Sequence, residues 1–173
     1  MMCLQAHYRS ELEFSWEGLA AALTRLKRLV MGVEKLQAKV AQAEVKQSAI
    51  ATAHGLQFDA CISDDLNTSI GLTLIEELLS MKTPDAGAAL EAITTMDTVL
   101  GLNLLTLTRA DLRIRPKGAQ ITEAEIEAAL SARKEARAAK DFARSDALRD
   151  ALTAQGVEVM DGDPLGWDWK LDI

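Results

Sequence analysis

The sequence predicts a mainly α-helical protein, with an antiparallel helical bundle followed by a small helical hairpin and a short terminal β-hairpin. Hydrophobic residues make up 49% of the chain and aromatic residues only 4%. This balance favours packed helices over a β-sandwich, whose strands are rich in aromatic and β-branched side chains. Apolar residues also recur at intervals of three and four, which is the period of an amphipathic helix. A chain of 173 residues accommodates one ordinary domain or two small ones.

The first expected helix begins after Ser15, a residue type that caps helix N-termini. Its apolar stripe consists of Leu19, Leu23, Leu26, Val30, Val33 and Leu36. The stripe continues more weakly through Val40 and Val45 towards Ile50, and Gly55 is expected to interrupt the helix.

Further start and stop signals predict the rest of the bundle. Asn67 or Thr68 can cap a second helix, and Thr83 followed by Pro84 indicates the start of a third. Gly101 is a natural end for that helix. The first hundred residues therefore predict three or four antiparallel helices.

The pattern changes after residue 101. Residues 102–121 read as a linker, and Thr122 with Glu125 forms the sequence signature of a capping box. We expect one helix to run from there to about Ala139, and a second from about Asp141 to Gln155.

The last residues read as a β-hairpin. Strands are expected at Val157–Val159 and at 167–171, separated by a turn rich in Asp, Gly and Pro. We place the boundary between two domains after residue 115, giving 1–115 and 116–173.

The chain has a formal net charge of −7, which argues mildly against a dedicated nucleic-acid binder. Residues 133–150 have a local basic bias, however. Arg133, Arg137 and Lys140 stand at i, i+4 and i+7, so we expect them on one helix face, where a row of cations suits a phosphate backbone. The alternative is an ordinary solvated face.

Phe142, Asp146 and Arg149 form a similar row on the next expected helix. An exposed aromatic ring can stack on an unpaired base while a nearby carboxylate or guanidinium reads its edge. Phe142 can equally belong to the core. Trp167 and Trp169 share one face of a strand, and that face either packs on the helices or is available to RNA.

The sequence contains no phosphate-binding GxxxxGK[ST] loop and no GxGxxG motif. His7 and His54 have no cysteine at zinc-ligand spacing, and no Ser/His/Asp set is credible. Cys3 and Cys61 belong to no CxxC pair, which favours a reducing compartment and hence the cytoplasm. No apolar stretch reaches the roughly 20 residues that span a bilayer.

Three segments, in order, resemble cysteinyl-tRNA synthetases. His7–Ser10 with Phe14 and Ser15 resembles HYRSPLNFS, and FDACISDDLNT at 58–68 is similar to F-x-x-A-M-D-D-D-F-N-T. The segment 132–169 resembles R-x-x-A-R-x-x-K-D-[WF]-x-x-A-D-x-[IL]-R-D followed by x-L-x-x-x-G-[IV]-x-[LV]-x-D.

This chain departs from these patterns at a few positions. The family often has Pro where this chain has Glu11 and Ser69, and some members have Trp where it has Phe142. The terminal turn is one residue longer than usual, and Trp167 is additional.

The resemblance implies that 1–115 is a helical bundle of the DALR, anticodon-binding type and that 116–173 recognises the anticodon of tRNA(Cys). It implies stacking by Phe142, base-edge acceptance by Asp146 and Asp161, and a base or phosphate contact by Arg137, with Arg133 and Trp169 as weaker members of the same site. The implied partners are tRNA(Cys) and the synthetase's N-terminal catalytic domain, with no DNA and no membrane.

The HIGH-like and KMSKS-like motifs and the zinc ligands of the family are missing from this sequence. We therefore expect no cofactor in this chain, because the family uses ATP, Mg and Zn through its catalytic domain, and no aminoacylation by this chain alone. We expect a piece of a longer enzyme, with a stand-alone module or a split synthetase as alternatives. A synthetase-derived helical adaptor for a protein partner is the rival hypothesis.

Overall fold

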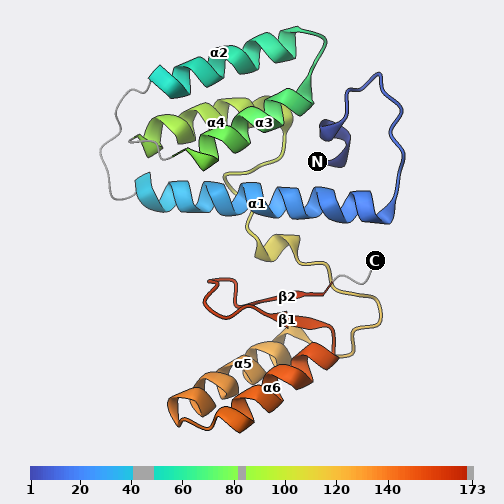
Figure 1. Cartoon of the computed structure of the whole chain (residues 1–173), viewed down its shortest axis with the longest axis vertical. Helices are drawn as coiled ribbons and strands as arrows, with labels where there is room; N and C mark the ends of the chain where they lie inside the picture. Colours follow the sequence, from blue (N-terminus) through green and yellow to red (C-terminus); the bar gives the residue numbers. More distant parts are fainter. Residues whose placement is uncertain (41–48, 82–84, 171–173) are drawn as a thin grey trace. The chain divides into compact units, whose positions relative to one another are not determined.

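The computed structural model describes residues 1–40, 49–81 and 85–170 and confirms the mainly α-helical class (Figure 1). The chain divides into two compact units, Met1–Leu112 and Arg113–Ile173. The division lies close to the domain boundary that the sequence predicts after residue 115. In the described part of the chain, no helix has the length and apolar character needed to cross a membrane.

The first unit is a helical bundle. Its described residues form α1 (Trp16–Val40), α2 (Ala49–Ser63), α3 (Thr68–Ser80) and α4 (Ala86–Leu100), with short 3-10 helices at Met2–Gln5 and Ala110–Leu112. The buried side chains that join the helices include Leu29, Val30, Val33, Phe58, Leu72, Ile75, Leu78, Ile93, Met96, Leu100 and Leu104. These four helices agree with the three or four that the apolar periodicity predicts.

Several predicted helix ends are confirmed by their hydrogen bonds. The Oγ of Ser15 accepts from the backbone N–H of Gly18 at 2.9 Å at the start of α1. The side chain of Asn67 accepts from the N–H of Ile70 at the start of α3. Gly101 ends α4 in the left-handed region, with φ of 65°, a conformation that a residue without Cβ adopts without strain.

The prediction for residues 50–63 was wrong. Ile50 does not extend the first helix but lies in α2, and Gly55, expected to interrupt a helix, lies inside α2. Ala51, His54, Phe58 and Cys61 are buried and recur at intervals of three and four residues, so they form one face of α2. Burial of this face stabilises a helix that local signals do not predict.

Two further predictions concern residues near the gaps in the described chain. Val45, Thr83 and Pro84 lie outside the described residues. The helix expected to start at Thr83 and Pro84 begins at Ala86, where the side chain of Asp85 accepts from the N–H of Ala88 at 3.0 Å.

Two of the motif segments noted in the sequence meet in the first unit. The hydroxyl of Tyr8 donates to Asp65 at 2.7 Å, and a terminal nitrogen of Arg9 lies 3.1 Å from the same carboxylate oxygen. Asp65 and Leu66 both have positive φ, of 58° and 55°. The tight turn between α2 and α3 therefore presents Asp65 to the N-terminal segment.

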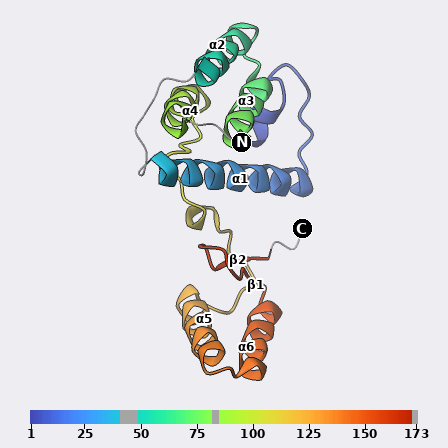
Figure 2. The same ribbon diagram turned by 60° about the vertical axis from the view of Figure 1, so that its left-hand side comes forward.

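The second unit is a helical hairpin with a small sheet. It contains α5 (Glu123–Ala138), α6 (Phe142–Ala154), β1 (Val157–Val159) and β2 (Trp167–Trp169). The strands pair antiparallel, with Val157 opposite Trp169 and Val159 opposite Trp167. Figure 2 shows α5 and α6 side by side, with the strands near the open end of the hairpin. The predicted β-hairpin is thus confirmed, while residue 171 lies outside the described residues.

The core of the second unit is small and separate from that of the first. Its buried members are Ile121, Ile126, Leu152, Val157, Trp167 and Trp169. The predicted capping box is present at the start of α5, because Glu125 accepts from the N–H of Thr122 at 2.8 Å while Thr122 accepts from the N–H of Glu125.

The turn between the two helices corrects one prediction. α5 ends at Ala138, and Lys140 lies beyond it with φ of 59°. Lys140 therefore does not continue the helical row of Arg133 and Arg137. Instead its left-handed backbone turns the chain into α6, whose N-cap Asp141 accepts from the N–H of Arg144 at 3.1 Å.

Candidate functional site

A charged pair links α5 to the loop that follows β1. The two terminal nitrogens of Arg133 donate to the two carboxylate oxygens of Asp161 at 2.6 and 2.7 Å. Only 5% of the Arg133 side chain is exposed, compared with 45% of the Asp161 side chain. The hydrogen bonds from Arg133 lower the pKa of the Asp161 carboxyl, so this group is a stable anion that can only accept hydrogen bonds.

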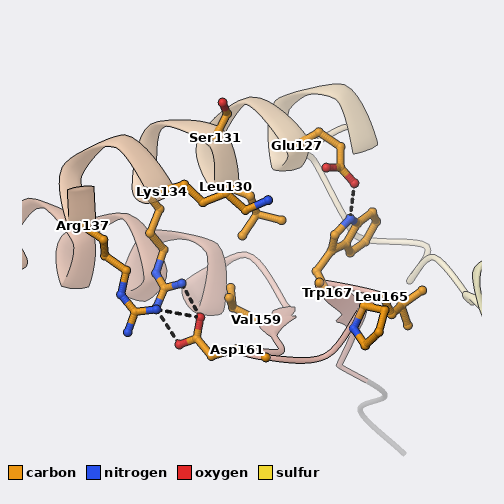
Figure 3. Close-up of a pocket in the computed structure, with 13 residues that line it drawn as sticks. Glu127, Leu130, Ser131, Lys134, Arg137, Val159, Asp161, Leu165 and Trp167 are labelled. Carbon is orange, nitrogen blue, oxygen red and sulfur yellow. Dashed lines mark hydrogen bonds and ion pairs between the residues drawn. The ribbon is translucent and has the colours of Figure 1, made fainter. Parts of the chain in front are cut away.

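Arg137 stands one helical turn after Arg133 and approaches the same carboxylate. Its terminal nitrogen lies 3.3 Å from Asp161 Oδ1, and about half of its side chain is exposed. Figure 3 shows Arg137 on α5 beside Asp161 on the facing loop, with Lys134 on the same helix. A cavity of about 480 Å³ lies between this face of α5 and the loop. The cavity is large enough for a nucleobase-sized group and has cations along one side.

Two charged residues of α6, Asp146 and Arg149, add to the cluster formed by Arg133, Arg137 and Asp161. The charge of Asp146 acts on Arg133 and that of Arg149 acts on Asp161, which places both side chains within electrostatic range of the pair. Asp146 and Arg149 also lie close to each other, with 3.7 Å between Oδ1 and a terminal nitrogen. The structure therefore brings Asp161, in the loop after β1, together with Arg133 and Arg137 of α5 and Asp146 of α6.

Phe142 is exposed and is not part of the core. It is the first residue of α6, and 62% of its surface is accessible. Asp146 follows it by one helical turn and is exposed as well. Of the two alternatives that the sequence leaves open for this ring, the structure selects the exposed one, and an exposed aromatic ring next to a carboxylate suits an unpaired base.

Trp169 has the opposite environment. It is 3% exposed and Trp167 is fully buried, and their rings pack edge to face with centroids 5.4 Å apart. The strand face that carries them is therefore packed in the core, so the prediction that Trp169 contributes to a binding site does not agree with its position. The physical reason is that this unit has few other large apolar side chains to bury.

The sequence did not indicate several residues that shape this site. Glu127 accepts from the indole N–H of Trp167 at 2.7 Å and lines the cavity. The guanidinium of Arg113 lies 3.8 Å from the ring centroid of Trp167 and donates to the carbonyls of Leu165 and Trp167. Glu127 could have been found from its spacing, because it lies on the same helix face as Leu130 and Lys134.

The structure offers no evident metal centre in its described residues, where no three His, Cys, Asp or Glu side chains gather in a way that would hold an ion.

Comparison with known proteins finds similar sequences in one family. Residues 122–164 match the cysteinyl-tRNA ligase anticodon binding domain. The cysteine–tRNA ligase of Novosphingobium aromaticivorans is 61% identical to this chain over 171 residues. Nearly the whole chain is therefore similar to one part of the cysteine–tRNA ligases. The cysteine–tRNA ligases of Zymomonas mobilis and Hydrogenovibrio crunogenus are 41% and 34% identical to it.

These relatives are much longer than the chain. The matches cover 99%, 98% and 96% of this chain but only 35%, 39% and 35% of the three cysteine–tRNA ligases. The matched anticodon-binding domain spans α5, α6, β1 and the following turn. It includes Arg133, Arg137, Phe142, Asp146 and Asp161 but not Trp169. The matches favour a tRNA-ligase module over a protein-binding adaptor.

Proposed function

We propose that this chain is the tRNA-binding C-terminal portion of a cysteine–tRNA ligase and that its second unit reads the anticodon of tRNA(Cys). The observation that carries the proposal is the position of an exposed aromatic ring, Phe142, one helical turn before Asp146, whose charge acts on the Arg133 that binds Asp161. A stacking surface next to fixed acceptors is what recognition of a single-stranded loop requires.

Each side chain has a role that follows from its chemistry. Phe142 stacks on an unpaired base, because its ring is accessible and nothing else in the second unit offers a comparable aromatic face among the described residues. Asp146 and Asp161 accept hydrogen bonds from amino or imino groups on base edges. Arg137, which is half exposed, donates to a base or a phosphate.

The local charge supports RNA binding despite the acidic chain. The net charge of the whole sequence is −7. Around the site, the cations Arg133, Lys134, Arg137 and Arg149 equal in number the acids Glu127, Asp146, Asp150 and Asp161, so this region is not acidic like the chain as a whole. Binding should therefore weaken with salt, since phosphate contacts release counterions.

The remaining parts of the proposal concern the longer enzyme. The first unit packs against the catalytic domain and positions the stem side of the tRNA. ATP-dependent cysteinylation, with its ATP, Mg and Zn, belongs to the catalytic domain, so this chain needs no cofactor and does not catalyse the reaction alone. The place of action is the cytoplasm, and the partners are tRNA(Cys) and the catalytic domain, not DNA or a membrane.

The proposal is tested by titrating the chain into labelled tRNA(Cys) transcript and into a transcript with a swapped anticodon, each at two salt concentrations. We expect tighter binding to the native anticodon and weaker binding to both transcripts at higher salt. Asp146→Ala should reduce the preference by about 1–3 kcal/mol, as expected for the loss of one base contact. Equal affinity of the unmodified chain for both transcripts would contradict anticodon reading and would favour the adaptor alternative.

A further inference from the structure

Arg133 differs from the other cations of the site in its burial. Its side chain is 5% exposed, whereas Arg137 is 52% exposed one turn later on the same helix. Both terminal nitrogens of Arg133 are directed at Asp161. The Nε of Arg133 is buried and has no hydrogen-bond partner among the described residues. A guanidinium in this position has little surface left for RNA.

The buried guanidinium depends on Asp161 for its compensation. A charge removed from water is stable only when it is paired and hydrogen-bonded. Here that partner is one carboxylate, bound in a two-pronged arrangement that fixes both its position and its plane. Asp161, in turn, is bound from the protein side and keeps 45% of its side chain exposed.

Asp161 lies in the loop that joins β1 to β2. The loop is closed on itself by backbone bonds, including Met160 N–H to the Gly166 carbonyl at 2.8 Å and Gly166 N–H to the Asp163 carbonyl at 3.0 Å. Contacts with α5 lie at both ends of the loop: Glu127 accepts from Trp167 at the start of β2 (Figure 3), and Arg133 and Arg137 bind Asp161 at the other end. Without Arg133, the Asp161 side chain keeps the longer contact to Arg137, at 3.3 Å.

We propose that Arg133 is a positioning residue that does not contact the RNA but acts through Asp161, fixing the orientation in which this carboxylate meets a base. The inference rests on the proposed function of the second unit and deepens it, because it separates Arg133 from the residues that touch the tRNA. When a guanidinium binds both oxygens of a carboxylate from the protein side, the remaining lone pairs of the carboxylate point towards solvent in a fixed direction. Discrimination at the base that Asp161 contacts then requires both Arg133 and Asp161.

The first measurement needs no RNA. The pKa of the Asp161 carboxyl is followed in the full chain by NMR through its side-chain carbon resonance. In the unmodified chain it lies below the ordinary value, because Arg133 hydrogen-bonds the anion. We expect Arg133→Met to raise this pKa towards the ordinary value and Lys134→Met to leave it unchanged. An unchanged pKa in Arg133→Met overturns the proposal, whatever the RNA results are.

The second measurement is a double-mutant cycle on anticodon preference, defined as the ratio of Kd for the swapped transcript to Kd for the native one. Arg133→Met and Asp161→Asn should each lower this ratio by about tenfold. Combined, they should lower it no further than Asp161→Asn alone. Arg133→Lys keeps the positive charge but cannot form the two parallel hydrogen bonds to the carboxylate. We therefore expect its ratio to lie between those of Arg133→Met and the unmodified chain.

Lys134→Met is the matched control, because Lys134 is the next residue on α5 and its substitution removes one positive charge while the hydrogen bonds from Arg133 and Arg137 to Asp161 stay in place. It should weaken binding to both transcripts equally. An additional loss of preference when Arg133→Met is placed in the Asp161→Asn background would mean that Arg133 touches RNA directly and would overturn the proposal. An equal loss for both transcripts in Arg133→Met, with a lowered Tm, would mean a structural role only. If the unmodified chain shows no preference, the proposed function fails, and the NMR titration alone decides whether Arg133 holds Asp161.

Discussion

Gly71 lies against the ring of Phe58 so closely that a Cβ added to Gly71 would be 2.8 Å from Cε2 of Phe58. Gly71 is buried on α3, and Phe58 is 3% exposed on α2. The close contact of these two helices therefore depends on a position without a side chain. It also explains how the ring of Phe58 enters the core of the first unit.

We expect Gly71→Ala to lower the free energy of unfolding of the first unit by about 1–3 kcal/mol, because the Phe58 ring must move out of its packed position. Gly55→Ala is the matched control, since nothing lies within 4 Å of a Cβ at that helical position. It should stabilise the unit by about 0.5–1 kcal/mol through the higher helix propensity of Ala. Urea denaturation followed through amide resonances of α3 measures both, and equal effects of the two variants would contradict the packing argument.

The Arg133–Asp161 pair predicts a pH dependence of stability. Because the pKa of Asp161 is lowered in the folded chain, its contribution is fully present above the unfolded-state pKa, about 3.9, and is lost as the pH falls through the folded value. The stability difference between the unmodified chain and Asp161→Asn should therefore be constant above about pH 5. It should shrink as the solution becomes more acidic.

Urea denaturation at several pH values, followed by the fluorescence of Trp167 and Trp169 in a Trp16→Phe background, gives this difference. Trp16 is exposed in the first unit and would otherwise add an unrelated signal. A difference that stays the same from pH 3 to pH 7 would show that the ionised carboxylate does not stabilise the fold.

Phe142→Ala should separate binding from stability. The ring is 62% exposed, so its removal should change the free energy of unfolding little, while binding to tRNA(Cys) should weaken by about 1–3 kcal/mol if the ring stacks on a base. Leu56→Ala provides a control, because Leu56 is 67% exposed on α2 of the other unit and should leave the affinity unchanged. Unaltered affinity of a folded Phe142→Ala variant would remove this residue from the site.

Lys140→Gly should stabilise the second unit by about 1 kcal/mol, because Lys140 holds a left-handed conformation with φ of 59° in which a Cβ is unfavourable. Thermal or urea unfolding of the second unit measures the gain. Lys140→Ala, which keeps a Cβ at the same φ, should give no such gain. Similar stability of the Gly and Ala variants would show that the turn is not strained.

The sequence alone determined much of this protein. Apolar spacing fixed most of the helices, and short-range chemistry fixed their ends, because caps such as Ser15 and Thr122 bond to backbone groups three residues away. The local cation–aromatic–carboxylate pattern of residues 133–146 was also visible, since helical spacing alone places such residues on neighbouring turns.

Only the tertiary structure decided which side chains are buried. The α2 helix containing Gly55 forms because its buried face packs against α3 and α4, and local propensity carries no information about that packing. Arg133 and Arg137 look alike in the sequence, and so do Phe142 and Trp169. One member of each pair is buried and the other exposed. Arg133 is buried where it binds Asp161 in the loop after β1, and Trp169 is buried where β2 packs in the core of the second unit. These contacts join residues far apart in the chain, so local spacing does not predict them.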